Sequence, residues 1–329
     1  MNNSNVKKYL VTGGTGFIGA ALVKRLVIEG HSVRVLDNNS RGSTRRLFGL
    51  ADDSIEYIEG DIRDPQVCND AVRDMDCVIH LAFVNGTEFF YSKPRLVLEV
   101  GVKGITNILD ACLLNKVGDL IVASSSEVYQ TPPNVPTAED APLSVPDPLN
   151  PRYSYGGGKI ISELMAINYG REDFDRVVIF RPHNVFGPDM GWEHVIPQFA
   201  LRMLTQLERG EKFDFPIQGD GTEQRAFIYI DDFISGLMSI INKGDHLQIY
   251  HIGTEQETTI QELAQLVGTC LDANIKVVPG ELSEGSTLRR CPDTRKLRAL
   301  GFQPEWALQD ALQSTVDWYR DNRVLAPKL

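Results

Sequence analysis

A tyrosine and a lysine four residues apart give the strongest chemical signal in the sequence. Tyr155 and Lys159 enclose three glycines in the run YGGGK. Residues four apart project from one face of a helix. A neighbouring ammonium, together with a positively charged nicotinamide ring, lowers the pKa of a phenol from about 10, so Tyr155 would serve as a base near neutral pH. A surface pair is the simpler interpretation, but each glycine costs about 1 kcal/mol in a helix interior, which indicates that a close backbone approach requires them.

A run of hydroxyl and carboxyl side chains lies upstream, directly after a predicted strand. Ser124 to Tyr129 reads SSSEVY, and the strand before it covers Leu120 to Ala123. A hydroxyl at the end of a neighbouring parallel strand can hold the substrate oxygen that Tyr155 deprotonates, while a hydride moves between the substrate carbon and a nicotinamide. Glu127 adds an ionisable group that is either a further acid/base or the anchor of a loop.

Glycines at a fixed spacing follow the first predicted strand. Gly13, Gly16 and Gly19 in TGGTGFIG have the spacing GxxGxxG and open the first predicted helix. The first glycine permits a turn, the second lets a pyrophosphate approach the backbone, and the third packs the helix on its strand, while the helix N-terminus supplies N–H donors. The pattern predicts a dinucleotide site, and an ordinary strand-to-helix loop is the alternative for the glycines alone.

Acidic residues after the second and third predicted strands bear on the choice of cofactor. Asp37 closes the second strand, where a carboxylate binds the hydroxyls of an adenine ribose and repels a ribose phosphate, so NAD is favoured over NADP. Asp61 and Ile62 in GDIRD suggest an adenine contact, with a helix-capping Asp as the alternative. Three arginines follow Asp37 and keep NADP open, unless they form a solvated loop face: Arg41, Arg45 and Arg46.

Strands and helices alternate through the first half of the sequence. The predicted strands cover 9–11, 32–36, 55–58, 77–81, 120–123 and 177–180, and helices cover 20–28, 67–74, 94–115 and 154–170. This alternation predicts an α/β fold with a Rossmann-type doubly wound parallel sheet. Prolines and glycines become frequent after Phe180, and further helices are expected near 194–208, 231–242, 259–271 and 307–322. We therefore expect an NAD-binding domain over 1–180, to which parts of the later chain can return, and a smaller α/β substrate lobe over 181–329.

Composition restricts the class of partner. Of the 329 residues, 42% are hydrophobic and 23% are charged, and the formal net charge is -11. An acidic chain is a poor match for nucleic acid or an anionic membrane, and no run is long enough to span a bilayer. The five cysteines are scattered without a CxxC pair, so neither a disulfide framework nor a metal site is expected. With no leader followed by a cleavage site, the expected compartment is the cytoplasm.

Together these motifs resemble the extended short-chain dehydrogenases, specifically the NAD-dependent epimerase/dehydratase family. The resemblance rests on TGGTGFIG, Asp37, GDIRD, HLA at 80–82, SSSEVY and YGGGK, and it covers residues 8 to 322. It implies tightly held NAD, a Ser125 hydroxyl that acts beside Tyr155, and a homodimer built from helices 94–115 and 154–170. The cofactor-binding residues that it implies are Gly13, Gly16, Phe17, Ile18, Gly19, Asp37, Asp61, Ile62, Tyr155 and Lys159.

The second half resembles the nucleotide-sugar branch of that family. Asn184 in RPHNVFGP matches a residue that contacts a diphosphate, and Arg225 in GDGTEQR and Arg290 in RRCPD match phosphate-binding arginines. Guanidinium groups bind phosphate oxygens through paired hydrogen bonds, so the implied ligand is a nucleotide-diphosphate sugar, with Ser126 also contacting it. The simpler interpretations are surface salt bridges for the arginines, a turn residue for Asn184 and a structural role for His183.

The branch implies oxidation of sugar C4 to a ketone as the first step, and the outcomes diverge from there. A 4-epimerase returns the hydride to the other face and needs only Tyr155, Ser125 and NAD, and the sequence slightly favours this outcome. A uronate decarboxylase or a 4,6-dehydratase is the alternative, because both tend to carry a glutamate where Glu127 stands. The run from Pro151 to Lys159 resembles the decarboxylases. The rival classes are an NADP-dependent ketone reductase and a non-catalytic dinucleotide sensor, whose signature would be the loss of Tyr155 or Lys159.

Three places depart from the family pattern. Gln130 stands where glycine usually follows SSxxVY, the segment Phe83 to Phe90 replaces smaller residues after HLA, and YGGGK is unusually rich in glycine. The second segment is expected near the sugar, so a familiar substrate such as UDP-glucose does not simply carry over.

Overall fold

Short, buried runs of aliphatic residues form the main sheet, and that sheet belongs to one of two compact units. The computed structural model describes residues 6–51, 53–210, 214–281 and 287–326. The first unit contains the described residues up to Gln130, together with Pro142–Pro182 and Ile234–Tyr250. The second contains Thr131–Ala141, His183–Phe233 and the described residues from His251 onward.

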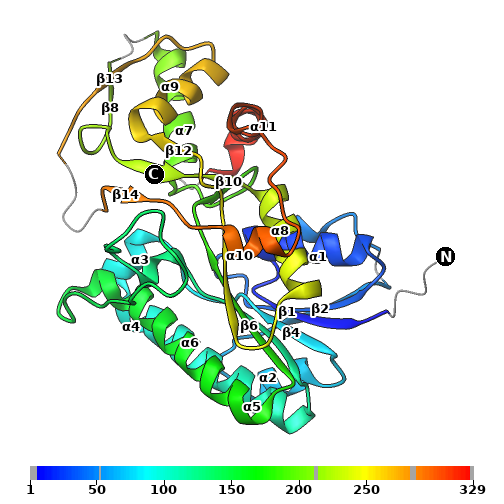
Figure 1. Cartoon of the computed structure of the whole chain (residues 1–329). Helices are drawn as coiled ribbons and strands as arrows, with labels where there is room; N and C mark the ends of the chain where they lie inside the picture. Colours follow the sequence, from blue (N-terminus) through cyan, green and yellow to red (C-terminus); the bar gives the residue numbers. More distant parts are fainter. Residues whose placement is uncertain (1–5, 52, 211–213, 282–286, 327–329) are drawn as a thin grey trace. The chain divides into compact units, whose positions relative to one another are not determined.

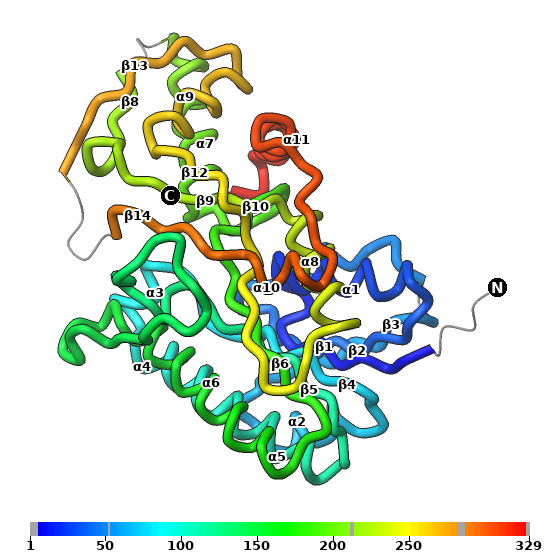
Figure 2. The backbone as a smooth tube through the Cα atoms, in the orientation of Figure 1, coloured from blue at the N-terminus to red at the C-terminus, as the bar shows by residue number. Residues whose placement is uncertain are grey.

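Within the described residues, the main sheet has seven strands in the order β11-β6-β5-β4-β1-β2-β3. The strands β1 to β6 pair in parallel and lie side by side in Figure 2. Their carboxyl ends meet at one edge, where ligands bind in open α/β sheets. The strands are β1 (Lys8–Thr12), β2 (Ser32–Asp37), β3 (Ile55–Glu59), β4 (Cys77–His80), β5 (Asp119–Ala123), β6 (Arg176–Pro182) and β11 (Gln248–Ile252).

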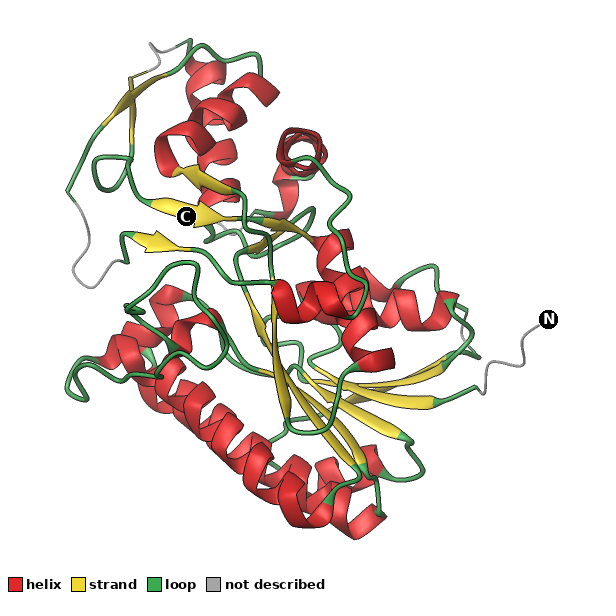
Figure 3. Ribbon diagram, viewed as in Figure 1, coloured by secondary structure: helices red, strands yellow, loops and turns green. Residues whose placement is uncertain are grey.

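Helices cover both faces of this sheet. Figure 1 shows α2, α5 and α6 on one face and α1 on the other, and Figure 3 shows the yellow strands between these red helices. This arrangement confirms the predicted doubly wound Rossmann-type fold. The helices are α1 (Phe17–Ile28), α2 (Pro65–Val72), α3 (Thr87–Ser92), α4 (Pro94–Leu98), α5 (Gly104–Asn115), α6 (Ser154–Asp173) and α8 (Ile230–Lys243), of which α8 begins in the second unit.

The predicted helix over 94–115 is interrupted, and a short helix before it was not predicted. A π-helical turn, Glu99–Lys103, joins α4 to α5, and Gly101 lies inside it. Such turns are rare and occur mostly as local bulges in α-helices, often at functional sites. The helix α3 has only six residues, TEFFYS, and its consecutive aromatic residues do not show the spacing of an amphipathic helix. The helix α3 overlaps the segment that departs from the family pattern, and Gly101 packs against Phe83 of that segment.

The second unit contains small sheets and amphipathic helices. Its strands pair as β10-β7, β12-β9-β14 and β13-β8. Thr259 and Glu262 form a reciprocal capping box that begins α9. The strands are β7 (Val185–Phe186), β8 (Asp214–Pro216), β9 (Gln224–Ala226), β10 (Ile228–Tyr229), β12 (Glu257–Thr259), β13 (Lys276–Val278) and β14 (Arg289–Arg290). The helices are α7 (Val195–Arg209), α9 (Ile260–Cys270), α10 (Arg295–Ala299) and α11 (Leu308–Asp321).

The surface of the helices bears on two expectations from the sequence. Across the described ranges, none of the helices has the length and apolar character needed to cross a membrane. Leu114 and Leu164 are large apolar side chains exposed on α5 and α6, the helices expected to form a dimer. The homodimer itself stays a prediction.

Candidate active site

The glycine-rich loop between β1 and α1 leaves no room for side chains where the backbone must come close. Gly13 has a φ of 72°, and a Cβ there would lie 2.8 Å from the backbone nitrogen of Ala82. A Cβ on Gly19 would lie 2.1 Å from the Gly13 carbonyl oxygen. Gly16 is the N-cap of α1 and offers no side-chain cap, so the helix begins with backbone N–H groups suited to an anion. Phe17 and Ile18 form its first turn. The loop therefore fits a dinucleotide pyrophosphate.

Asp37 holds its carboxylate next to this loop at the end of β2. One oxygen accepts a hydrogen bond from the Thr15 backbone N–H at 3.0 Å, and the other accepts from the Asn39 backbone N–H at 2.9 Å. An ionised carboxylate has about four lone-pair sites, so capacity remains for ribose hydroxyls. Among the nearby arginines, Arg46 donates to the Thr15 carbonyl at 3.1 Å and Arg41 lies 4.8 Å above the Phe89 ring. These contacts favour NAD at this position.

We expect Asp37→Ser to weaken NAD binding by about 10- to 100-fold, because hydrogen bonds to a charged group contribute about 1.5–3 kcal/mol. The loss of the carboxylate also removes the repulsion of a ribose phosphate, so the preference for NAD over NADP should shrink. Titration calorimetry with both dinucleotides measures the change. Asp64→Ser is the matched control, because Asp64 caps α2 and serine is also a good cap. Tighter binding of NADP than of NAD by the unmodified chain would contradict the assignment.

Asp61 and Ile62 have different surroundings after β3. The Asp61 carboxylate pairs with Arg63 at 2.6 Å, and the hydrogen bond from Arg63 lowers the pKa of Asp61. The N-cap of α2 is Asp64, so the capping alternative for Asp61 is wrong. Ile62 is buried and fills the space over Gly104, where a Cβ would meet its Cδ1 at 2.3 Å. An adenine contact by this pair stays a prediction.

The run after β5 brings Ser125 and Glu127 next to Tyr155. Ser125 is buried, and its hydroxyl accepts from the Glu127 backbone N–H at 3.1 Å, which caps the short turn Ser126–Val128. The Ser125 side chain lowers the pKa of Tyr155, and the charge of Glu127 raises the pKa of the same phenol. Ser126 is buried within the turn. The structure thus gathers the hydroxyl, the phenol and the carboxylate that the sequence singled out.

Lys159 lies on α6 one turn after Tyr155, and both side chains are buried. The Lys159 ammonium donates to the Ala123 carbonyl at 2.6 Å and lies 6.0 Å from the centre of the Tyr155 ring. The contact to Ala123 ties α6 to the end of β5. It fixes the ammonium next to the tyrosine that it is expected to assist.

In the absence of cofactor, burial is the largest influence on the pKa values of Tyr155 and Lys159. It raises the pKa of Tyr155 well above its ordinary value; the hydrogen bond from Ser125 opposes this rise and the charge of Glu127 adds to it. Burial also lowers the pKa of Lys159 to about 7, although Glu163 opposes the shift. The chain alone therefore does not lower the pKa of Tyr155 as the sequence suggested. That expectation also included the positive charge of a nicotinamide ring.

A buried ionic network next to the site was not recognised in the sequence. Arg181 donates to both carboxylate oxygens of Glu163, at 2.8 and 2.6 Å, and each side chain is 2% exposed. Ser124 donates to the same carboxylate, and Arg181 also donates to the Tyr129 hydroxyl. The network therefore joins both ends of the SSSEVY run to α6 and β6. The available signals were Glu163 four residues after Lys159, and an arginine ending the apolar run of β6.

In the second unit, the candidate phosphate ligands gather on β9. Arg225 on β9 and Arg290 on β14 are register partners of a parallel pair. Such partners lie about 4.8 Å apart and point to the same side of the sheet. The Asn184 amide donates to the Ala226 carbonyl at 2.9 Å, so it lies at the end of the same strand. Arg225 also donates to the Thr287 carbonyl at 2.5 Å, which orders its guanidinium.

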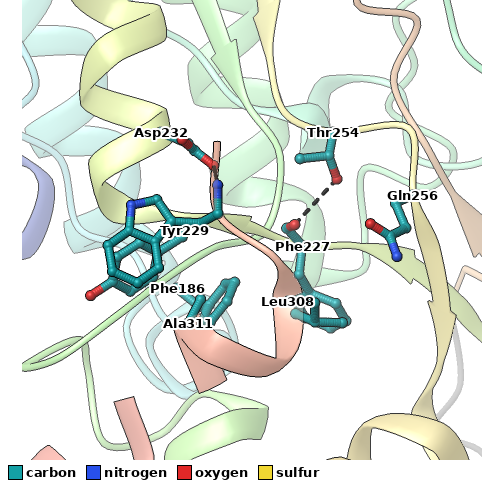
Figure 4. Close-up of a pocket in the computed structure, with 9 residues that line it drawn as sticks. Phe186, Phe227, Tyr229, Asp232, Thr254, Gln256, Leu308 and Ala311 are labelled. Carbon is teal, nitrogen blue, oxygen red and sulfur yellow. Dashed lines mark hydrogen bonds between the residues drawn. The ribbon is translucent and has the colours of Figure 1, made fainter. Parts of the chain in front are cut away.

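Two other features of the second unit lie apart from this cluster. His183 is buried and packs edge-on against His251 with 4.7 Å between ring centres, which favours the structural interpretation of His183. A pocket lined largely by aromatic side chains contains the hydrogen bond from the Thr254 hydroxyl to the Phe227 carbonyl, drawn in Figure 4. Its lining residues are Phe186, Phe227, Tyr229, Asp232, Thr254, Gln256, Trp306, Leu308 and Ala311, and it includes none of the three phosphate candidates.

Comparison with known protein families gives a match over most of the chain. The model of the NAD dependent epimerase/dehydratase family matches residues 9–253. The chain belongs to this family. It is therefore an NAD-dependent enzyme of the type that the motifs implied, and NAD is the cofactor of the family.

Individual relatives resemble the chain along nearly its whole length. It is 33% identical to the low-salt glycan biosynthesis protein Agl12 of Haloferax volcanii, covering 94% of this chain and 97% of that protein. It is 31% identical to the UDP-N-acetyl-alpha-D-glucosaminuronate decarboxylase of Bacillus cytotoxicus, covering 96% and 98%. The crystal structure of the dTDP-glucose 4,6-dehydratase DesIV from Streptomyces venezuelae, with NAD and TYD bound, has a TM-score of 0.84 at 31% identity, covering 96% and 98%.

The reactions named for these relatives differ. The named activities include uronate decarboxylation, 4,6-dehydration and 4-epimerisation. The chain is therefore an enzyme of the nucleotide-sugar epimerase, dehydratase and decarboxylase type.

Proposed function

We propose that this chain decarboxylates a nucleotide-linked uronic acid after oxidising its C4 hydroxyl with bound NAD. The observation that carries the proposal is Glu127, which the Ser125-capped turn holds where its charge acts on Tyr155. Bound NAD would supply hydride transfer to and from C4. The glycine loop, Asp37 and Lys159 are the proposed residues that hold the cofactor.

Tyr155 and Ser125 are the proposed groups at the C4 oxygen. Tyr155 takes the hydroxyl proton as C4 becomes a ketone, and the Ser125 hydroxyl keeps the oxygen in place. The Ser125 side chain lowers the pKa of Tyr155, so the two groups are close enough for one substrate oxygen to contact both.

Glu127 distinguishes decarboxylation from the other outcomes. In a 4-keto uronate the bond from C5 to C6 breaks, its electrons pass to the C4 oxygen, carbon dioxide leaves, and C5 then takes a proton. One acid suffices for that proton. Elimination of water needs two groups, a base for the C5 proton and an acid for the leaving hydroxyl, and the residue next to Glu127 is Ser126, which does not ionise. Decarboxylation matches one carboxylate on the turn.

Arg152 is the proposed partner of the substrate carboxylate. It lies three residues before Tyr155, in the short helical turn Pro151–Tyr153. Among the described residues, its buried Nε makes no hydrogen bond. A buried guanidinium N–H needs an acceptor, and a carboxylate accepts from arginine through paired bonds. In the second unit, Asn184, Arg225 and Arg290 are the proposed diphosphate ligands.

A 4-epimerase is the second candidate, as the sequence favoured. It requires Tyr155, Ser125 and NAD and leaves Glu127 without a chemical role. Solved 4-epimerases are among the structures similar to this chain, including one from Methanobrevibacter ruminantium. The mass of the product separates the two candidates.

The deciding experiment incubates the full chain with NAD and a panel of UDP- and dTDP-sugars that includes uronates, followed by mass spectrometry. Loss of the mass of carbon dioxide from a uronate supports the proposal. An unchanged mass with a new sugar stereoisomer indicates the epimerase, and loss of water indicates a dehydratase.

We expect Glu127→Gln to slow the protonation of C5, and with it the formation of the decarboxylated product, by about 10²- to 10⁴-fold, the usual contribution of a positioned acid/base. Oxidation at C4 should persist, because Tyr155 and Ser125 are unchanged, and stopped-flow absorbance of the nicotinamide follows that step. Glu172→Gln, the same change on the exposed last turn of α6, should leave both steps unchanged. Equal activity of Glu127→Gln and the unmodified enzyme would remove Glu127 from the mechanism.

A further inference from the structure

Phe83 contacts both members of the pair proposed to carry the proton chemistry. It follows β4 by three residues, in the segment where smaller residues are usual. Its ring centre lies 4.1 Å from the Lys159 Nζ. It also lies 5.1 Å from the centre of the Tyr155 ring, with the two planes at 84°. One side chain thus supports the ammonium with its face and meets the phenol at an edge.

Two glycines make room for this ring. A Cβ on Gly101, inside the π-helical turn, would lie 2.3 Å from Phe83 Cζ, closer than real carbon atoms approach. A Cβ on Gly158 of α6 would lie 3.1 Å from the same atom. We call the space between Gly101 and Gly158 the glycine notch. It explains why the third glycine of YGGGK accompanies a large residue after HLA.

A second phenylalanine fixes the tyrosine from another side. Phe90 on α3 stacks against Tyr155, with 4.8 Å between ring centres and 16° between planes. With one face against Phe90 and a further contact at Phe83, the Tyr155 ring has little freedom to tilt. Aromatic contacts of this kind contribute beyond simple burial. The two phenylalanines therefore act together as walls of the proton-transfer pair.

We propose that Phe83 is a positioning residue for Lys159, in which a ring seated in the glycine notch supports the ammonium next to Tyr155. The inference rests on the proposed role of Tyr155 and Lys159 as the proton-transfer pair. It applies equally to decarboxylation and to epimerisation, because both begin at C4 with this pair.

The contact between the Phe83 ring and Lys159 favours the charged form of the lysine. The face of an aromatic ring attracts a cation, and the attraction grows when water is excluded. The groups that face Lys159 are Glu163 and Tyr155 on its own helix, His80 on β4 and the Ala123 carbonyl at the end of β5. Burial lowers the pKa of His80 to about 3 and raises that of Tyr155, so neither titrates between pH 5 and 9. Glu163 is paired with Arg181.

Phe83→Leu tests the ring face, because leucine keeps apolar volume without a π system. We expect the pKa of Lys159, about 7 in the unmodified chain, to fall by about half to one and a half pH units, since removal of the ring disfavours the charged form. NMR titration of isotope-labelled lysine in the full chain measures this without turnover, both with and without NAD. The alkaline limb of kcat/KM should move to lower pH by the same amount, and Phe83→Met should behave alike.

Gly101→Ala tests the notch. Its methyl group should displace the Phe83 ring, lower the thermal midpoint by several degrees and shift the pKa of Lys159 as Phe83→Leu does. In the Phe83→Leu background, Gly101→Ala should lower the thermal midpoint only slightly, because the ring atoms that the methyl group would meet are absent. Gly157→Ala is the matched control: its nearest neighbour, Val145 Cγ2, lies at an ordinary 3.6 Å, so neither stability nor the titration should suffer.

An unchanged Lys159 titration in Phe83→Leu and Phe83→Met, with only the thermal midpoint lowered, would reduce Phe83 to packing and overturn the inference. If the losses of thermal midpoint caused by Gly101→Ala and Phe83→Leu were fully additive, the proposed role of the glycine notch would be wrong. Both results are independent of the proposed reaction, which fails instead if Tyr155→Phe keeps its turnover.

Discussion

Tyr155→Phe should lower turnover by about 10²- to 10⁴-fold while leaving nucleotide-sugar binding unchanged. The hydroxyl is the atom that takes the proton from the C4 oxygen, and phenylalanine removes that atom alone. The ring packs between Phe83 and Phe90 in a buried position, so phenylalanine keeps these contacts and the fold. Steady-state kinetics with the substrate found by mass spectrometry measures the loss, and calorimetry measures binding.

The control for this variant lies two residues earlier. Tyr153→Phe removes a half-buried phenol in the turn before α6 and should retain ordinary turnover. If Tyr155→Phe works as fast as the unmodified enzyme, Tyr155 is not the base, and the proposed reaction fails whatever product is formed.

Glu163→Gln should destabilise the fold by about 3–5 kcal/mol, the usual cost of leaving one member of a buried ion pair without its partner. Arg181 would keep its charge at 2% exposure and lose the opposite charge, and one of its two hydrogen bonds would face an amide NH2 group in place of an oxygen. The Ser124 hydroxyl, which donates to the same carboxylate, would keep at most a neutral amide oxygen as its acceptor. Denaturant unfolding, with the slope checked for two-state behaviour, measures the change.

Two further variants separate the buried network from a general effect of charge. Asp70→Asn removes an exposed carboxylate that pairs with Arg73 and should leave stability unchanged, because exposed pairs contribute little. Glu163→Leu combined with Arg181→Met should recover much of the loss, because it removes both charges. A Glu163→Gln variant as stable as the unmodified chain would show that the pair is dispensable.

The sequence predicts the strands and long helices well, because their signals are local. The run from Leu120 to Ala123 is apolar throughout, and α6 begins where Tyr155 and Lys159 require one helical face. The need for glycine at position 101 could not be predicted from its neighbours in the sequence, because the ring that excludes a side chain there is Phe83, eighteen residues earlier.

The site shows the same division between local and distant signals. The motif positions of Ser125, Tyr155 and Lys159 indicate their proximity, since each lies at a strand end or on one helix face. Glu163 and Arg181 are eighteen residues apart, and each alone resembles a surface charge. Only the packing of α6 against β6 makes them partners. The pKa direction of Tyr155 also depends on burial by Phe83 and Phe90, which spacing does not reveal.

Each of the two units is built from several separate stretches of the chain, which limits how the protein can be truncated or divided. The chain passes from one unit to the other at Gln130, Ala141, Pro182, Phe233 and Tyr250. The strand β11 lies at the edge of the main sheet, yet in the sequence it follows His183–Phe233, which belongs to the second unit. No single cleavage or truncation therefore releases either unit as a continuous piece. The cofactor half cannot be transplanted as a cassette, and a change of substrate specificity has to be made by substitutions inside the intact chain.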